Sequence, residues 1–167
     1  MGPEIVALGL GIPMDHPGLK RGIGGIFDSI SRVFIRALGT FGIQAYFQPK
    51  NDLEVSGKKI AGLAAALETE NAFLFHTSLL VDFDIPLMLD IMNTPAIKVR
   101  DKGYNCFSQR MTTVREEAGG PVTVEAVVRA IERAFEECFS VSLHQDRPDD
   151  WESETARQLL RERYTRQ

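Results

Sequence analysis

The chain has 167 residues, of which 44% are hydrophobic and 25% are charged, and its formal net charge at pH 7 is −4. This composition predicts one soluble globular domain over residues 1–167, and the acidic balance gives no basic footprint for nucleic acid. The apolar run from Ile5 to Met14 is interrupted by glycine and proline and has no basic leader, so we expect neither a signal peptide nor a membrane span. Two cysteines without metal-ligand spacing suit a reducing cytoplasm, where we expect the protein to reside.

The first half of the chain is predicted to contain most of the strands. A buried strand is expected from Glu4 to Ile12, another from Ile43 to Phe47, and a third from Ala72 to Val81. Between the first two, a helix ending at Gly39 is predicted from apolar residues at helical spacing. Those residues are Ile26, Ile30, Val33, Phe34, Ala37 and Leu38.

Helices dominate the second half. Asp84 is expected to cap a short helix that runs to Met92, and Thr113 begins a brief helix that Gly119 ends. Thr123 caps a longer helix, and Asp149 or Asp150 starts a last amphipathic one that reaches Tyr164. The predicted apolar face of the longer helix contains Val124, Val127, Val128, Ile131, Phe135 and Cys138, so Cys138 is expected to be a small core residue. Strands followed by helices indicate an α+β fold, with helices against a sheet.

The segment from Asn51 to Gly62 is the most informative part of the chain. Its Ser56-Gly57 pair predicts a two-residue hairpin turn, which fixes the register of the flanking strands. The expected cross-strand pairs are Val55 with Lys58, Glu54 with Lys59, Leu53 with Ile60, and Asp52 with Ala61. This register directs Asp52, Glu54 and Lys59 to one face of the hairpin, and Asn51 stands at the entrance to that face. Leu53 and Ile60 point toward the core.

Two interpretations of this hairpin follow from the residues alone. Charged side chains on one face of a hairpin are commonly just its solvated side, and Glu54 is more readily a surface ion-pair partner than a catalyst. However, the strand continues beyond Lys59 as Ala61-Gly62-Leu63-Ala64-Ala65-Ala66, and such small residues allow a ligand to lie close to the backbone.

The run Asn-Asp-Leu-x-Val-x-Gly-Lys-Lys-Ile-Ala-Gly resembles the central motif of the lipoate-protein ligase and biotin-protein ligase superfamily. The resemblance implies a class II synthetase-like α+β fold with a mixed sheet flanked by helices. It also implies that Lys59, and not Lys58, is the catalytic lysine. Asn51 and Asp52 correspond to a pair near the phosphates, where Asp52 would bind Mg²⁺, and Gly62 and Ala64 would contact the substrate.

Members of this family activate a carboxylic acid with ATP and then pass the acyl group to a lysine of a carrier protein. The resemblance therefore implies ATP, Mg²⁺, lipoate or octanoate, and a lipoyl-domain carrier protein as reactants and partners. Negative charge grows on the acyl carbonyl oxygen and the bridging phosphate during both steps. A fixed ammonium such as that of Lys59 stabilises this charge, and removing a donor of this kind costs roughly 3 to 4 kcal/mol of barrier.

The segment from Phe73 to Asp84 distinguishes the two branches of the superfamily. It is similar to the lipoate-ligase strand that carries a histidine followed by Gly-Thr-Leu-Leu, and His76 is the matching histidine. This resemblance favours lipoate or octanoate over biotin. The chain departs from the pattern at Thr77, where glycine is usual.

Alternatives remain for the mechanism. Octanoyltransferases of the same fold use a cysteine thioester in place of ATP, but neither Cys106 nor Cys138 stands at a family position. A non-catalytic subunit that binds lipoyl domains is a further possibility, although it would not need Lys59.

The N-terminal part of the family pattern is expected to be missing. Lipoate ligases carry an Arg-Arg-x-x-Gly-Gly loop before the first strand of this chain, so we expect a second subunit to supply that loop, or self-association. The run from Lys20 to Gly25 superficially repeats the loop, but it directly precedes a helix and is a weak signal for phosphate binding.

Overall fold

The structure is a computed structural model that describes residues 4–20, 22–67, 72–91 and 110–164. A five-stranded sheet has the order β1-β5-β4-β3-β2, and every neighbouring pair is antiparallel. The strands are β1 (Ile5–Pro13), β2 (Tyr46–Gln48), β3 (Asp52–Val55), β4 (Lys58–Leu67) and β5 (Ala72–Leu80). The α+β prediction is confirmed. A sheet with both parallel and antiparallel strands was expected. Among the described residues, however, the parallel pairing is limited to a single bridge between Lys59 and Met111.

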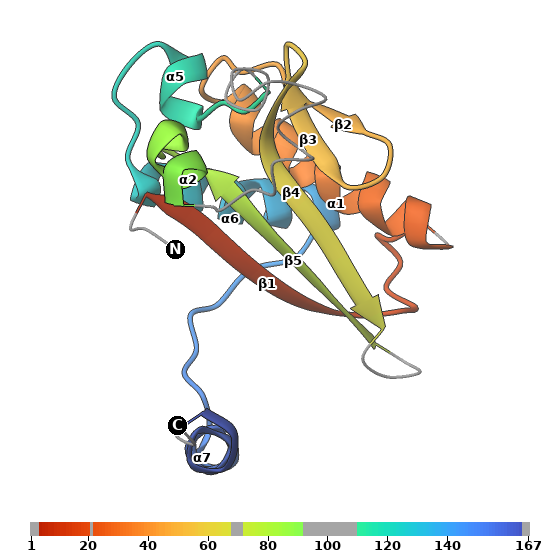
Figure 1. Cartoon of the computed structure of the whole chain (residues 1–167). Coiled ribbons are helices and arrows are strands. Elements are labelled where there is room, and N and C mark those ends of the chain that lie inside the picture. The colour runs from red at the N-terminus through yellow and green to blue at the C-terminus, as the bar shows by residue number, and fades with distance from the viewer. Residues whose placement is uncertain (1–3, 21, 68–71, 92–109, 165–167) are drawn as a thin grey trace.

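Two long helices, α1 (Gly22–Gly39) and α6 (Val124–Phe139), cover one face of the sheet (Figure 1). The core lies between them and the strands. The ring of Phe34 in α1 stacks on Phe75 in β5 and meets Phe135 of α6 edge-on, with ring centroids 6.4 and 6.3 Å apart. All six apolar positions predicted for the first helix are buried, so that prediction is confirmed.

The opposite face of the sheet is open. Every second residue of β1 lies on this open face. The prediction that β1 is a buried strand is therefore wrong for most of its length, because its buried side chains are Val6 and Ile12. On this face, Ser78 of β5 lies between Ala7 of β1 and Gly62 of β4. In the same way, His76 of β5 lies between Gly9 of β1 and Ala64 of β4. This face is lined mainly by small residues, so it forms a trough that large side chains do not fill.

The short helices lie at one end of the sheet, beside the tip of the β3–β4 hairpin (Figure 1). Helix α2 (Ile85–Ile91) begins after Asp84, whose carboxylate accepts a hydrogen bond of 2.9 Å from the Leu87 amide. Helix α5 (Val114–Ala118) is capped by Thr113 and ends at Gly119, which has a left-handed φ of 65°. Both helix starts agree with the sequence predictions, while Met92 lies outside the described residues.

The last helix, α7 (Asp150–Leu159), continues into a π-helical turn, η1 (Leu160–Tyr164). A capping box between Asp149 and Glu152 starts it, so the first of the two predicted starts is correct. None of the residues of α7 and η1 is buried, and Figure 1 shows α7 apart from the sheet and the other helices. The apolar side of this helix, including Trp151 and Tyr164, is therefore exposed.

Two smaller predictions need correction. Cys138 is exposed, because the half-buried Phe139 covers the last turn of α6 instead. The glycine-rich run before α1 forms the start of that helix. A Cβ on Gly25 would stand 2.8 Å from the backbone of Lys20, so this glycine permits a close turn into the helix. Within the described residues, no helix combines the length and the apolar character required to cross a membrane.

Candidate active site

The β3–β4 hairpin turns at Ser56 and Gly57, whose φ angles of 52° and 80° are both positive, as a type I′ turn requires. The predicted turn is confirmed. Two predicted pairs, Val55 with Lys58 and Glu54 with Lys59, are also observed. The next two pairs are wrong, because the register shifts and pairs Leu53 with Ala61 and Asp52 with Gly62.

The shift is a β-bulge in which Ile60 is the additional residue of β4. Ile60 and Ala61 are consequently both buried, at 0% and 1% exposure. The bulge reverses the alternation of β4, so Gly62 and Ala64 lie on the same open face as Lys59. In the predicted register they would have pointed into the core. The bulge thus aligns the lysine with the small residues that continue its strand.

The side chain of Lys59 folds back over Gly62 toward Asp52. Its Nζ lies 2.6 Å from Asp52 Oδ1, and the two side chains are 37% and 30% exposed. The contact is an ion pair whose angles do not make a hydrogen bond, and Oδ1 is a buried oxygen without a hydrogen-bond partner in the described part of the chain. The Lys59 ammonium is therefore the charged group that faces this oxygen.

The backbone of Lys59 is held on the side away from β3. Its amide donates to the carbonyl oxygen of Arg110 over 2.7 Å, and its own carbonyl accepts from the Thr112 amide over 2.9 Å. These bonds create the parallel bridge between Lys59 and Met111. Two hydrogen bonds thus hold the main chain of the lysine, and the ion pair with Asp52 directs its head group, an arrangement that suits the stabilisation of charge at a defined point.

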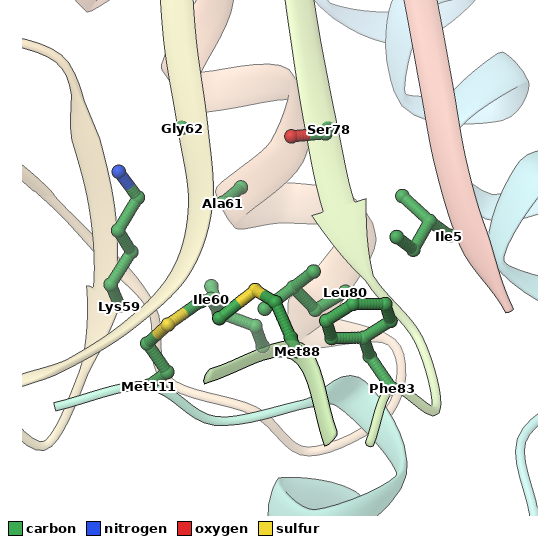
Figure 2. Close-up of a pocket in the computed structure, with 10 residues that line it drawn as sticks. All are labelled: Ile5, Lys59, Ile60, Ala61, Gly62, Ser78, Leu80, Phe83, Met88 and Met111. Carbon is green, nitrogen blue, oxygen red and sulfur yellow. The ribbon is translucent and has the colours of Figure 1, made fainter. Parts of the chain in front are cut away.

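Two hollows meet beside Lys59. Figure 2 shows the first, a mostly apolar pocket of about 370 Å³ with the lysine on one side and methionine and phenylalanine side chains on its floor. It is lined by Ile5, Lys59, Ile60, Ala61, Gly62, Ser78, Leu80, Phe83, Met88 and Met111. The second hollow is the trough over the open sheet face, with a volume of about 570 Å³. Gly62 and Ser78 belong to both.

The predicted site residues gather around this junction. Asn51, Gly62, Ala64 and His76 line the trough, and Asp52 contacts the lysine that borders the pocket. His76 is exposed on the open face between Gly9 and Ala64, its neighbours on the adjoining strands. Residues separated by up to 25 positions in the sequence therefore surround one cavity system.

Sequence reasoning missed part of this site. Ser78, Met88 and Met111 border the pocket, but no local motif marks them, because the pocket wall is assembled from separate segments. Glu54 differs from the expected surface ion pair, since its carboxylate accepts a hydrogen bond of 3.0 Å from the Tyr46 hydroxyl. That bond raises the pKa of Tyr46 above its usual value of 10.0. Cys106 lies outside the described residues, and Cys138 lines neither hollow.

Comparisons with known proteins give relatives in sequence and in fold. The octanoyltransferase LipM of Brevibacillus brevis is 29% identical over 113 residues, which are 68% of this chain and 41% of that protein. A structure from the bi-partite lipoate protein ligase system of Thermoplasma acidophilum superposes with a TM-score of 0.83 at 24% identity, over 97% of this chain and 62% of that one. A lipoate-protein ligase A bound with ATP gives a TM-score of 0.80 at 20% identity, over 98% and 64% of the two chains.

The chain thus spans between 41% and 64% of the length of these three proteins. The family model for the lipoyl protein ligase A/B catalytic domain matches residues 9–136, which include the hairpin, most of the residues that line the trough and the segment that pairs with Lys59. The expected lipoyl branch is confirmed, and the chain belongs to the lipoyl protein ligase A/B catalytic domain family.

Proposed function

We propose that this chain takes part in the ATP-dependent attachment of lipoate or octanoate to a lysine of a lipoyl-domain carrier protein. The observation that carries the proposal is the position of Lys59, whose ammonium lies where an apolar pocket and a trough of small residues meet. An acyl-adenylate has an acyl chain and a nucleotide on either side of one mixed anhydride. A cation at the junction of two hollows suits that shape.

The trough is proposed to hold the acyl chain. It is lined by Gly62 and Ala64 on one strand and by His76 on the next, so a hydrocarbon chain can lie against the backbone. The pocket on the other side of Lys59 has a floor of Met88, Met111 and Phe83 (Figure 2). Polarisable and aromatic side chains of this kind suit a flat purine base.

Asp52 is proposed to hold Mg²⁺. Its buried Oδ1 has no hydrogen bond within the described residues, and carboxylate oxygen is a ligand that this ion prefers. The described residues contain no group of three or more acidic, histidine or cysteine ligands. A bound Mg²⁺ would be held by Asp52 and would neutralise phosphate charge.

Two transfers make up the proposed reaction. In the first, a carboxylate oxygen of the fatty acid attacks the α-phosphorus of ATP, and pyrophosphate leaves. In the second, the carrier lysine, as a neutral amine, attacks the acyl carbonyl carbon; AMP leaves and the amine loses its proton as the amide forms. Lys59 would donate hydrogen bonds to the carbonyl and bridging oxygens, on which negative charge increases in both steps.

Octanoyl transfer from an acyl carrier is the second candidate, and the similarity to LipM of Brevibacillus brevis supports it. It requires no ATP, and it forms either a thioester on a cysteine or a direct bond to the acceptor lysine. Cys106 would be the thiol to examine. The two candidates differ in one measurable respect, because only the ligase consumes ATP.

We further propose that a second polypeptide completes the site. Among the described residues, the nine-residue strand β1 is at one edge of the sheet, and an edge strand is a template for the addition of another strand. A bi-partite lipoate protein ligase in Thermoplasma acidophilum gives a precedent for a ligase made of more than one chain. Self-association through the same edge is the alternative.

One experiment tests these proposals together. The chain is incubated with Mg²⁺, a lipoyl carrier domain and either lipoate with ATP or an octanoyl carrier without ATP, alone and with proteins encoded beside its gene. Mass spectrometry of the carrier is expected to show ATP-dependent lipoylation. Modification from the octanoyl carrier without ATP would favour the transferase, and a thioester on Cys106 would identify its nucleophile. No modification under any condition would contradict both.

A further inference from the structure

We propose that Thr112 and Glu117 are positioning residues for Lys59, and that they anchor the main chain of the lysine to helix α5. The catalytic consequence of this anchoring rests on the proposed function, whereas the anchoring itself can be measured without substrate. Neither residue lines the pocket or the trough, so both would act through Lys59.

Thr112 is the link between the strand and the helix. It is fully buried, with 0% exposure, and it makes bonds in two directions. Its amide donates to the carbonyl oxygen of Lys59 over 2.9 Å, and its hydroxyl donates to Glu117 Oε1 over 2.7 Å. A buried hydroxyl paired with a carboxylate is a charge-assisted hydrogen bond, which is stronger than one between neutral groups.

Lys59 needs this support because of where it stands in β4. The bulge interrupts the ladder with β3 immediately after Lys59, and the pairing of β4 with β5 begins only at Ala61, opposite Leu79. A bulge leaves a strand locally less well paired. On the edge of Lys59 that faces away from β3, its neighbour is therefore the segment from Arg110 to Thr112, and not a strand of the main sheet.

Helix α5 is itself fixed to the end of β5, and this makes it a rigid support. The amide of Arg115 donates to the carbonyl oxygen of Val81 over 2.9 Å. The guanidinium of Arg115 pairs with the carboxylate of Asp82 and donates to the carbonyl oxygen of Val122 over 3.2 Å. The connection therefore runs from Lys59 through Thr112 and α5 to Val81 and Asp82, the two residues that follow strand β5.

The neighbouring Glu116 provides a matched control. It lies on the same helix and pairs with Lys58 over 3.2 Å, but the two side chains are 54% and 37% exposed. Exposed ion pairs of this kind contribute little. Glu116 and Glu117 thus carry the same charge at adjacent positions, and only Glu117 bonds the residue that supports Lys59.

The test uses the full chain and the variants Thr112→Val, Thr112→Ser, Glu117→Ala and Glu116→Ala. Amide hydrogen exchange is measured first, without substrate. In Thr112→Val and Glu117→Ala, the Lys59 and Thr112 amides are expected to exchange about fivefold to tenfold faster, because one anchoring bond is lost. The Leu63 amide, which donates to the carbonyl oxygen of Asn51 in the same hairpin, should not change. Thr112→Ser and Glu116→Ala should behave like the unmodified chain.

Kinetics of carrier modification then separate positioning from general stability. Thr112→Val and Glu117→Ala are expected to lower kcat by about tenfold to a hundredfold with KM unchanged, as small displacements of a catalytic group do. Unchanged exchange at Lys59, unchanged kcat, or an equal loss in Glu116→Ala would each overturn the proposal. If Thr112→Val does not fold, Glu117→Ala removes the same bond and decides the question. If the unmodified chain transfers no acyl group, the proposed function fails and the exchange data alone decide whether Lys59 is anchored.

Discussion

Lys59 occupies the space that a side chain on Gly62 would take. A Cβ on Gly62 would stand 3.2 Å from Lys59 Nζ and 3.3 Å from Cε, so the lysine head could keep its place beside Asp52 only by shifting slightly if residue 62 had a side chain. The β-bulge at Ile60 brings the two residues onto one face. Gly62 therefore helps to set the position of the Lys59 ammonium, in addition to leaving space for a ligand.

We expect Gly62→Ala to remove most of the activity while the protein remains folded. The atoms in conflict with the new Cβ are at the end of a flexible side chain, which moves away at small cost. A displaced ammonium no longer faces the developing charge, so the rate should fall by about tenfold to a hundredfold. Gly11→Ala is the control, because its Cβ would have nothing within 4 Å. Equal rates for the two variants, measured by mass spectrometry of the carrier, would contradict this reading.

Lys59→Ala and Lys58→Ala should separate the two adjacent lysines. Loss of the Lys59 ammonium is expected to lower the rate of carrier modification by roughly a hundredfold to a thousandfold. Lys58 makes an exposed ion pair with Glu116, so its replacement should cost well under 1 kcal/mol of stability and leave the rate within about twofold. The reverse ranking would show that the catalytic lysine has been misassigned within the hairpin.

Local sequence patterns predicted the elements well. Thr113, Thr123 and Asp149 start helices where their capping chemistry indicated, and Ser56-Gly57 makes the expected turn. Each of these signals depends on residues within about four positions, and hydrogen bonds to backbone amides decide them. The assignment of Asn51 and Asp52 to a site came from resemblance, and the structure places both beside Lys59 or the trough.

Longer-range features could not be predicted from the sequence. The bulge at Ile60 was missed because Leu53 and Ile60 can both be buried with or without it, so alternation alone does not decide the register. The pairing of Lys59 with the segment from Arg110 to Thr112 joins residues more than fifty positions apart. Cys138 has the spacing of a core residue, yet it is exposed in the last turn of α6, where the half-buried Phe139 packs against the core.

Thr77 fixes Gly62 from the core side of the sheet. Its buried hydroxyl, in a residue that is 4% exposed, donates to the Gly62 carbonyl oxygen over 2.8 Å. Thr77→Val removes the donor, and the free energy of unfolding in urea should fall by about 1 kcal/mol. Thr40→Val is the comparison, because its hydroxyl bonds the carbonyl oxygen of Ala37 on the exposed end of α1, where water can replace it. A loss no greater for Thr77→Val than for Thr40→Val would contradict the expectation.

Tyr46 should make the stability of the hairpin depend on alkaline pH. Its hydroxyl donates to Glu54 and accepts from the Gly57 amide over 3.1 Å, and the bond to Glu54 raises the pKa of Tyr46 above 10.0. A raised pKa in the folded state favours the neutral phenol, so its stabilisation is complete below about pH 10 and is lost as the pH rises through the folded value. We expect the stability difference between the unmodified chain and Tyr46→Phe to be constant at neutral pH and to shrink above that point.

Absorbance titration of tyrosinate gives an independent measure of the same group. Subtracting the curve of Tyr46→Phe from that of the unmodified chain should isolate a transition above pH 10, since Tyr46 must release its proton beside the Glu54 carboxylate. Glu54→Ala removes both the hydrogen-bond acceptor and the charge, so in that variant the transition should move back toward its usual position. A Tyr46 transition at or below pH 10 in the unmodified chain would mean that the phenol and the carboxylate are not paired in solution.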